Sequence, residues 1–365
     1  MTKNPAIELR QISKSFGPVQ ANKDINISVM PGTIHGIIGE NGAGKSTLMS
    51  ILYGFYKADA GEIFVDGKKI SIPDSQAAIA AGIGMVFQHF KLVENFSVLE
   101  NVVLGVEDGP FLSSSIQKAR INLKALAIEY ELNVDPDATI DSLGVGIRQR
   151  VEILKALYRK AKILILDEPT GVLTPAEADH LFRILKNLKE EGKTIIFITH
   201  KLREVMEIAD RVTVMRAGEV QGVSDTNKTS ITELASQMVG REVFLQVKKD
   251  EAKPKEKILD VQDLWVHDAR GLLAVKGINL EIRKGEIVGI AGVEGNGQTE
   301  LVEALTGLRK ASEGKVMYLD EDIASSTPKN IRRKKIAHIP EDRTNTGLNT
   351  QLSIWENLIG NSYFR

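Results

Sequence analysis

The chain has 365 residues, which is long enough for about two domains with hydrophobic cores. Its 47 Lys and Arg are balanced by 48 Asp and Glu, so no positive excess favours nonspecific binding to nucleic acid, and we expect no nucleic-acid partner. The lack of cysteine excludes disulfides and thiolate metal sites. No apolar run approaches the roughly 20 residues that a membrane helix needs, and the N-terminus has no signal-peptide core. We expect a soluble cytosolic protein, for which association with a membrane through a partner remains open.

The first chemical motif is a glycine-rich loop between a predicted strand, 33–38, and a predicted helix, 46–52. Its sequence, at 39–47, is Gly-Glu-Asn-Gly-Ala-Gly-Lys-Ser-Thr and fits the pattern G-x-x-x-x-G-K-[ST]. In that pattern backbone N–H groups surround phosphate oxygens, the lysine reaches the terminal phosphates, and the helix N-terminus adds positive potential. A glycine-rich turn alone is more often structural, but the complete pattern between a strand and a helix predicts nucleotide binding. The expected contacts are Gly39, Asn41, Gly42, Gly44, Lys45, Ser46 and Thr47.

A helical subdomain is predicted next, at about 94–160. Apolar residues recur every three or four positions in 116–130 and in 149–159, which is typical of helices with one buried face. Before this region, Gln88 follows the strand-like segment 84–87, and we expect it to contact a magnesium ion or the attacking water. A single glutamine at a strand end is usually structural.

Two carboxylates follow the apolar strand 163–166. We expect Asp167 at a magnesium ion that also takes the hydroxyl of Ser46, because phosphoryl transfer needs such a site. Successive side chains of a strand point to opposite sides, so we expect a separate role for Glu168, as general base or water-orienting group. A solvated acidic strand end is the alternative for this pair.

His200 ends the next strand, 194–199. In a parallel sheet it emerges at the same edge as Asp167, within reach of a γ-phosphate. A single histidine there is usually structural, but the order of these motifs after a phosphate loop favours a catalytic set of Lys45, Gln88, Glu168 and His200. Short β-branched strands that alternate with helices predict an α/β fold with a parallel sheet covered on both faces.

The second half of the chain repeats the spacing of the first half. Gly61-Glu-Ile corresponds to Gly314-Lys-Val, and 97–101 corresponds to 353–357. The match extends well beyond the phosphate loops. We therefore predict a tandem duplication.

The second phosphate loop, 292–300, has no lysine. Gln298 stands in the position of Lys45, which removes a charge-assisted hydrogen bond worth about 1.5–3 kcal/mol. Glu341 stands in the position of Gln88 and would bring negative charge near a phosphate. We still expect nucleotide contacts, in a weaker site, from Gly292, Gly295, Gly297 and Thr299.

These residues resemble the ATP-binding subunits of ABC transporters, which are P-loop NTPases, and the resemblance covers the whole chain. The matching motifs are 39–47, Gln88, the signature region 143–150, 163–168 and His200. The resemblance implies that Phe16 stacks on the adenine of ATP, with a core phenylalanine as the alternative. It also implies, for each domain, a parallel-sheet core with an antiparallel β subdomain and a helical subdomain.

Within the family, the tandem arrangement and the segments 168–177 and 339–343 resemble the subunits of simple-sugar and nucleoside importers, and 88–93 is closer to the nucleoside branch. The resemblance implies ATP and Mg²⁺ as cofactors, and two membrane permeases and a solute-binding lipoprotein as partners. It places the protein on the cytoplasmic face of the cell membrane, where ATP hydrolysis would be coupled to uptake. The alternatives are a nonhydrolytic nucleotide-binding or regulatory module, and a soluble tandem ATPase that acts on ribosomes or DNA.

The signature region departs from the family pattern. Leu-Gly-Val-Gly-Ile, at 143–147, stands where the family has Leu-Ser-Gly-Gly-Gln, so Gly144 lacks a serine hydroxyl. Backbone N–H groups at Gly144 and Gly146 and the helix start can still favour an anion. In the family's head-to-tail dimer this signature would face the lysine-free loop, so both defects would fall in one nucleotide sandwich. Two chains could instead pair through their first domains.

Three segments are predicted along the chain. The first ATPase domain spans 1–240, and a charge-dense segment with a proline, 241–257, is expected to be a linker, with a charged surface helix as the alternative. The remainder, 258–365, contains no second signature, Asp-Glu strand or strand-end histidine. We expect it to be the N-terminal part of a second ATPase domain.

Overall fold

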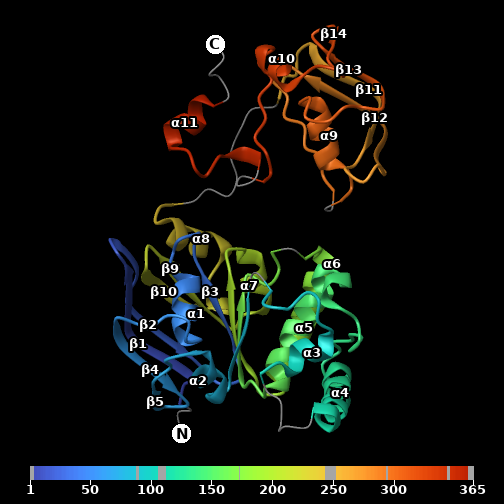
Figure 1. Ribbon diagram of the computed structural model, residues 1–365. Coiled ribbons are helices and arrows are strands. Elements are labelled where there is room, and N and C mark those ends of the chain that lie inside the picture. The colour runs from blue at the N-terminus through green and yellow to red at the C-terminus, as the bar shows by residue number, and fades with distance from the viewer. Residues whose placement is uncertain are drawn as a thin grey trace. The chain divides into compact units, whose positions relative to one another are not determined.

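The computed structural model describes residues 4–87, 90–105, 112–171, 173–242, 252–292, 295–342 and 346–360, with only the backbone at 112–115. It divides into two compact units, Met1–Val247 and Lys248–Arg365 (Figure 1). Each unit is described by itself below.

The first unit begins with an antiparallel sheet of four strands in the order β2-β1-β4-β5. Its long hairpin turns tightly after Phe16, where Gly17 takes a positive φ. Residues Ile7, Leu9 and Ile12 of the first strand are buried, so one face of this sheet covers the interior. The strands are β1 (Ile7–Phe16), β2 (Val19–Val29), β4 (Ala60–Val65) and β5 (Lys68–Ile70).

A second sheet of six strands forms the centre of this unit, in the order β10-β9-β3-β8-β7-β6. The neighbours from β9 to β6 are parallel, and β10 pairs antiparallel with β9. The parallel sheet predicted from the short apolar runs is therefore confirmed. The strands are β3 (Ile34–Ile38), β6 (Ile83–Val86), β7 (Ile163–Asp167), β8 (Thr194–Thr199), β9 (Arg211–Arg216) and β10 (Glu219–Asp225).

Alternate side chains of these strands enter two different cores. On β8, Ile195 and Phe197 pack with the helices, whereas Ile196 and Ile198 pack with the antiparallel sheet. Both faces are thus buried, which explains why the central strands are apolar at every position rather than at every second one. In Figure 1, α3 to α6 lie on the opposite side of this sheet from β1, β2, β4 and β5.

Several helices of the first unit begin at side-chain caps. Ser97 and Thr174 each form a capping box with the glutamate three residues later, which satisfies N–H groups of α3 and α6. Between residues 94 and 160 the described chain forms α3 (Val98–Val103), α4 (Leu112–Glu129), the short η1 (Ile140–Ser142) and α5 (Val145–Tyr158). The other helices are α1 (Lys45–Leu52), α2 (Ser75–Ala80), α6 (Pro175–Glu190), α7 (Leu202–Ile208), η2 (Thr226–Lys228) and α8 (Ile231–Val239).

The second unit repeats the antiparallel sheet of the first, in the order β12-β11-β13-β14. Its buried core contains Val261, Leu264 and Val316 from this sheet and Leu301 from the helix after the second glycine-rich loop. The predicted tandem repeat is confirmed. The elements are β11 (Lys257–His267), β12 (Leu273–Arg283), β13 (Glu313–Tyr318), β14 (Glu321–Asp322), α9 (Gln298–Leu305), α10 (Pro328–Arg333) and α11 (Ile354–Ile359).

The strands expected at the parallel-sheet positions of the second unit are absent from its described residues. Segment 287–291 aligns with β3 and 336–339 aligns with β6, yet neither is a strand, and Ile287 and Ile339 are 94% and 92% exposed. In the first unit β3 lies between β8 and β9, and β6 pairs with β7. The described part of the second unit has no counterpart of these partner strands, and a parallel strand cannot form without a neighbour to accept its hydrogen bonds.

Candidate ATPase site

The first glycine-rich loop has the backbone that its glycines permit. Gly42 and Gly44 have φ values of 83° and 93°, in the left-handed region, and Gly44 is the N-cap residue of α1. A Cβ atom added at Gly44 would collide with the carbonyl oxygen of Ala21, so the loop lies directly against β2. Along the loop, Gly39 is buried, Asn41 and Ser46 are exposed, and Thr47 is half-buried.

Lys45 curls back into this loop. Its Nζ donates hydrogen bonds to the carbonyl oxygens of Gly39 at 2.8 Å and Glu40 at 3.0 Å, and the residue is 5% exposed. Burial lowers the pKa of Lys45, and the nearby charges of Glu168 and Asp167 oppose that shift. The hydrogen-bond partners of the ammonium group are two neutral carbonyl oxygens, and a charged phosphate oxygen would bind it more strongly.

Asp167 ends β7 beside the start of α1. It is 6% exposed, the Ser46 hydroxyl donates a hydrogen bond to it, and its Oδ1 has no hydrogen-bond partner among the described residues. Burial raises the pKa of Asp167, and the charge of Glu168 adds to this, whereas the Ser46 bond and Lys45 lower it. A buried carboxylate oxygen without a partner, next to a hydroxyl, fits a hard divalent cation that takes its other ligands from phosphates and water.

Glu168 and His200 meet at the carboxyl edge of the sheet. His200 Nδ1 lies 3.0 Å from Glu168 Oε1, and their side chains are 47% and 15% exposed. Asp167 and Glu168 contact different groups, but the predicted reason for this, alternation of side chains along a strand, was wrong. The strand ends at Asp167, and a left-handed backbone at Glu168, with φ 46°, turns its side chain towards His200.

Two further contacts were predicted, Gln88 and Phe16. Gln88 falls outside the described residues. Phe16 ends β1 and is 42% exposed, which excludes the core alternative, and it packs edge-to-face against Tyr56 at 5.1 Å between ring centroids. Tyr56, which the sequence analysis did not single out, therefore widens the aromatic surface where β1 ends beside β2.

The signature region begins α5. Gly144 is the N-cap residue, no side chain caps the helix there, and a Cβ atom added at Gly144 would meet nothing within 4 Å. A Cβ atom at Gly146 would collide with Glu177. Gln149, which the sequence analysis also missed, is buried and donates to the carbonyl oxygen of Pro169 at 2.7 Å, so α5 is tied to the residue after Glu168.

The second glycine-rich loop has the same backbone without the lysine. Gly295 and Gly297 have φ values of 86° and 94°, and Gly297 is the N-cap residue of α9, as Gly44 is of α1. Gln298 folds back so closely over Gly292 that a Cβ atom there would collide with it. Gln298, Thr299 and Glu341 line one pocket, which brings a carboxylate into this loop's surroundings.

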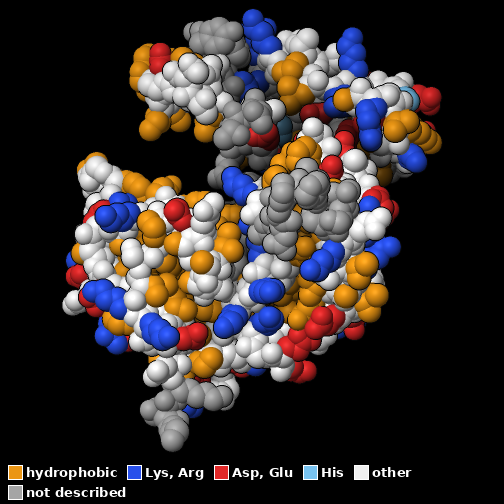
Figure 2. Space-filling view, turned by 60° about the horizontal axis from the view of Figure 1, so that its bottom comes forward, with side chains coloured by type: hydrophobic (Ala, Val, Ile, Leu, Met, Phe, Trp, Pro, Cys, Tyr) orange, Lys and Arg blue, Asp and Glu red, His pale blue; other side chains and the backbone are white. Residues whose placement is uncertain are grey.

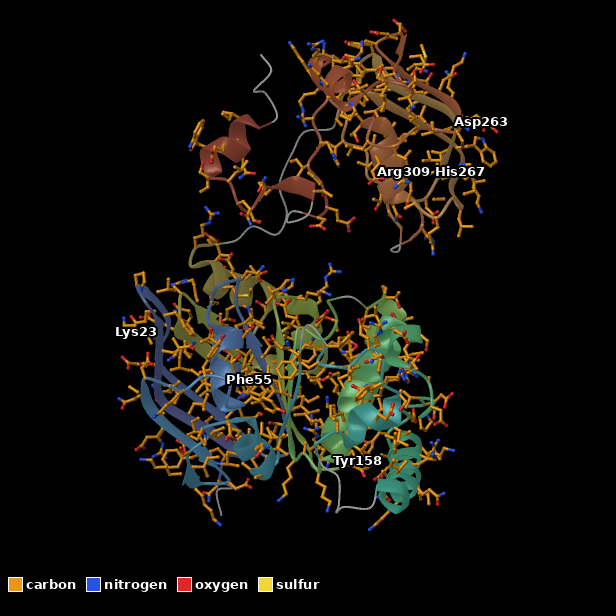
Figure 3. All side chains as sticks on the ribbon, viewed as in Figure 1. Lys23, Phe55, Tyr158, Asp263, His267 and Arg309 are labelled. Atoms are coloured by element: carbon orange, nitrogen blue, oxygen red, sulfur yellow. The ribbon has the colours of Figure 1, made fainter. Side chains whose placement is uncertain are left out.

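No aromatic side chain of the second unit takes the place of Phe16 among the described residues at the end of β11. Val266 is buried, and His267 is exposed, with its backbone carbonyl oxygen accepting a hydrogen bond from Arg309 at 3.1 Å (Figure 3). The second loop thus lacks both the lysine and the aromatic surface of the first.

The ABC transporter family model matches residues 22–171 and 275–363 of the chain. The chain belongs to this family. It is 45% identical to the nucleoside import ATP-binding protein NupA of Lactococcus lactis subsp. cremoris (strain MG1363), over 100% of this chain and 72% of that protein. It is 47% identical to the guanosine import ATP-binding protein NupO of Bacillus subtilis (strain 168), over 98% of this chain and 70% of that protein.

Solved ATP-binding cassettes of ABC transporters share the fold of the first unit. One in its ADP conformation has a TM-score of 0.55 and 28% identity, covering 64% of this chain and 95% of that chain. A dimeric bacterial cassette has a TM-score of 0.54 and 28% identity, covering 60% and 98%. The resemblance to the tandem ATP-binding subunits of importers is confirmed.

Proposed function

We propose that this chain is the ATPase subunit of an ABC importer for nucleosides, and that hydrolysis takes place at the phosphate loop of the first unit. The arrangement of Lys45, Asp167, Glu168 and His200 at one edge of the parallel sheet supports the site. The solute is inferred from the two relatives named for nucleoside and guanosine import. A relative named for glucose import, TsgD13 of Haloferax volcanii (strain ATCC 29605), is 43% identical, over 98% of this chain and 70% of that protein, so a simple sugar is the second candidate.

The chain's own groups cover what phosphoryl transfer requires. The loop N–H groups and the α1 N-terminus hold the β- and γ-phosphates, and Lys45 exchanges its two carbonyl partners for phosphate oxygens. Ser46 and Asp167 would hold Mg²⁺, which neutralises phosphate charge when bound. Phe16 and Tyr56 offer an exposed aromatic surface for the adenine.

Glu168 is the proton acceptor for the attacking water in this proposal. Its carboxylate is mostly shielded and lies against the ring of His200, which fixes its direction. His200 is half-exposed, so its other ring nitrogen, Nε2, can contact the γ-phosphate while Nδ1 stays at Glu168. Breakdown of ATP then separates the two halves of a nucleotide sandwich, which supplies the motion that permeases need.

A groove of about 300 Å³ between the sheet core and the helical region is the proposed permease site. Phe55, labelled in Figure 3, is 50% exposed on one wall of the groove. The centroid of its ring lies 5.5 Å from that of Phe87. The other wall carries Lys155 and Arg159, and Arg159 Nε is buried without a hydrogen-bond partner among the described residues. In Figure 2 the first unit likewise presents hydrophobic side chains among Lys and Arg on the face turned forward.

The aromatic rings and the Arg159 guanidinium, whose Nε lacks a hydrogen-bond partner among the described residues, suit a permease segment that offers an apolar side chain and a carboxylate. Glu152, whose pKa is raised by burial, accepts from the amide of Lys91 at 2.9 Å, so this wall is also tied to the segment that follows Gln88. No helix in the described part of the chain is long and apolar enough to cross a membrane. We propose that two permeases hold the protein at the cytoplasmic face and that a solute-binding lipoprotein delivers the nucleoside.

The proposal is tested by ATP hydrolysis in proteoliposomes that contain this chain together with the permeases and the binding lipoprotein proposed as its partners. Guanosine should stimulate hydrolysis and accumulate inside the vesicles, whereas ribose and glucose should do neither. Stimulation by a sugar alone would transfer the assignment to the sugar branch. Stimulation by ribosomes or DNA, with no solute effect, would contradict an importer.

A further inference from the structure

Two buried threonines flank the Glu168–His200 pair. Thr170 lies two residues after Glu168 and is 2% exposed, and Thr199 immediately precedes His200 and is 1% exposed. Thr170 belongs to the loop that leaves β7, and Thr199 is the last residue of β8, where the next loop begins. The two strands are parallel neighbours in the sheet. A hydroxyl at such depth needs a hydrogen-bond partner, because leaving it unpaired costs free energy.

One carboxylate serves both threonines. Glu204, in the first turn of α7, accepts from Thr170 Oγ1 at 2.6 Å with Oε1 and from Thr199 Oγ1 at 3.0 Å with Oε2. Lys201 Nζ lies 3.2 Å from Glu204 Oε1, and the Glu204 side chain is 12% exposed. Each oxygen of Glu204 therefore holds a different loop.

Lys201 closes this cluster. Its backbone N–H donates to Thr199 Oγ1 at 3.0 Å, and its Nζ donates to the carbonyl oxygen of Thr170 at 3.1 Å. The negative charge of Glu204 is thus balanced inside the cluster rather than by solvent. The two loops are joined by side chains in addition to the Glu168 N–H, which donates to the carbonyl oxygen of Ile198 at 3.0 Å.

The backbone at Glu168 explains why such a clamp is needed. A glutamate with φ 46° is in the left-handed region, which non-glycine residues avoid unless their surroundings hold them there. Release of the neighbouring loop would let Glu168 relax and turn away from His200. The two groups follow different strands, so a shift of either loop changes their 3.0 Å separation.

We propose that Glu204 is a positioning residue, which locks the loops after β7 and β8 so that Glu168 and His200 stay together for hydrolysis. This inference rests on the proposed roles of Glu168 and His200. Glu204 does not reach the phosphate site itself; its two oxygens are engaged by Thr170 and Thr199. Loss of the clamp should therefore affect the chemical step and leave ATP binding, which depends on the glycine-rich loop, largely intact.

The test compares Glu204→Ala and Glu204→Gln with Glu207→Ala, which removes an exposed carboxylate from the same helix. Steady-state kinetics should show kcat for ATP reduced about tenfold or more in Glu204→Ala, with KM and the Kd of a fluorescent ATP analogue changed less than about threefold. Glu204→Gln keeps the side-chain length and one acceptor oxygen, and its NH2 group can donate to the hydroxyl oxygen of the other threonine, so it should recover most of kcat. Glu207→Ala should match the wild type.

Glu204→Asp covers the case in which Glu204→Ala does not fold. It keeps the charge but is one methylene too short to hold both threonines, so kcat should fall while the melting temperature stays near that of Glu204→Gln. A kcat equal to that of Glu207→Ala in both Glu204→Ala and Glu204→Asp would overturn the proposal. So would an equal loss of kcat and of nucleotide affinity.

A double-mutant comparison separates positioning from a merely structural role. In a His200→Ala background the pair is already broken, so adding Glu204→Ala should reduce kcat little further. Full additivity would contradict the proposal. Glu168→Gln is run in parallel: if it turns over ATP like the wild type, the proposed catalytic site has failed, whereas an inactive Glu168→Gln beside an active Glu204→Ala defeats only the role of Glu204.

Discussion

Burial of the Asp167 carboxylate suits it to bind a metal ion but lowers the stability of the nucleotide-free protein. The carboxylate is buried, its pKa is raised by that burial, and one oxygen has no partner within the described structure. The ionised form is therefore disfavoured in the folded protein without nucleotide, and bound Mg²⁺ would supply the missing positive charge. Such a residue costs stability until its ligand arrives.

We expect Asp167→Asn to raise the melting temperature of the nucleotide-free protein by about 2 °C or more, because it removes the buried charge and keeps an acceptor for Ser46. The same variant should lose Mg²⁺-dependent ATP turnover. Differential scanning calorimetry in EDTA and a turnover assay with Mg²⁺ check both parts. A lower melting temperature in EDTA would contradict the account of Asp167.

Phe16 gives a second prediction at this scale. Phe16→Ala should raise the KM for ATP more than it lowers kcat, because stacking on adenine is remote from the reacting phosphate. The side chain is 42% exposed, so the free energy of unfolding should change by less than about 1 kcal/mol. Phe64→Ala on β4, which removes a half-buried ring, would show whether loss of another ring of the same sheet has the same effect. An unchanged KM would remove Phe16 from the adenine site.

Among the elements, α5 connects the signature region to the catalytic loop through the bond from Gln149 to Pro169. Its N-terminus has no side-chain cap, since Gly144 provides none. We expect Gly144→Ser to fit without strain, because the space beside it is open, and to stabilise the protein by a few tenths of a kcal/mol through the N-cap bond. Chemical denaturation measures this effect. If Gly144→Ser lowered the free energy of unfolding instead, the backbone at this position would require glycine.

Much of the element level could be predicted from the sequence, because apolar runs, glycine positions and strand-end polar residues depend on local chemistry. The phosphate loop and β7 are cases in which the pattern alone determines the structure. The turn of Glu168 and the clamp at Glu204 could not be predicted. They depend on a left-handed backbone and on two loops that meet only when β7 and β8 pair, and no local pattern marks either.

At the scale of the whole molecule, the two units share one phosphate-loop backbone but differ in the charge at its end. Lys45 and Gln298 occupy equivalent helix starts, and among the described residues only the first unit also has an Asp-Glu pair, Asp167 and Glu168, at the end of a parallel strand. We therefore expect hydrolysis at the phosphate loop of the first unit. Within the second unit, Gln298 and Glu341 line the same pocket, which disfavours a bound phosphate.

Matched substitutions at the two loops test this asymmetry. Lys45→Ala should abolish ATP turnover, because the loop loses the charge that reaches the terminal phosphates. Gln298→Ala, at the equivalent position, should keep turnover within about twofold of the wild type. Equal losses in the two variants, with unchanged melting temperatures, would contradict a single hydrolytic loop.

The most direct measurement is the identity of the nucleotide that stays bound to Glu168→Gln after incubation with Mg²⁺ and ATP. The substitution removes the proton acceptor and leaves the phosphate loop, Lys45 and Asp167 unchanged. Chromatography of the released nucleotide should find ATP, with turnover reduced at least about a hundredfold. Bound ADP, with turnover near that of the wild type, would contradict this prediction.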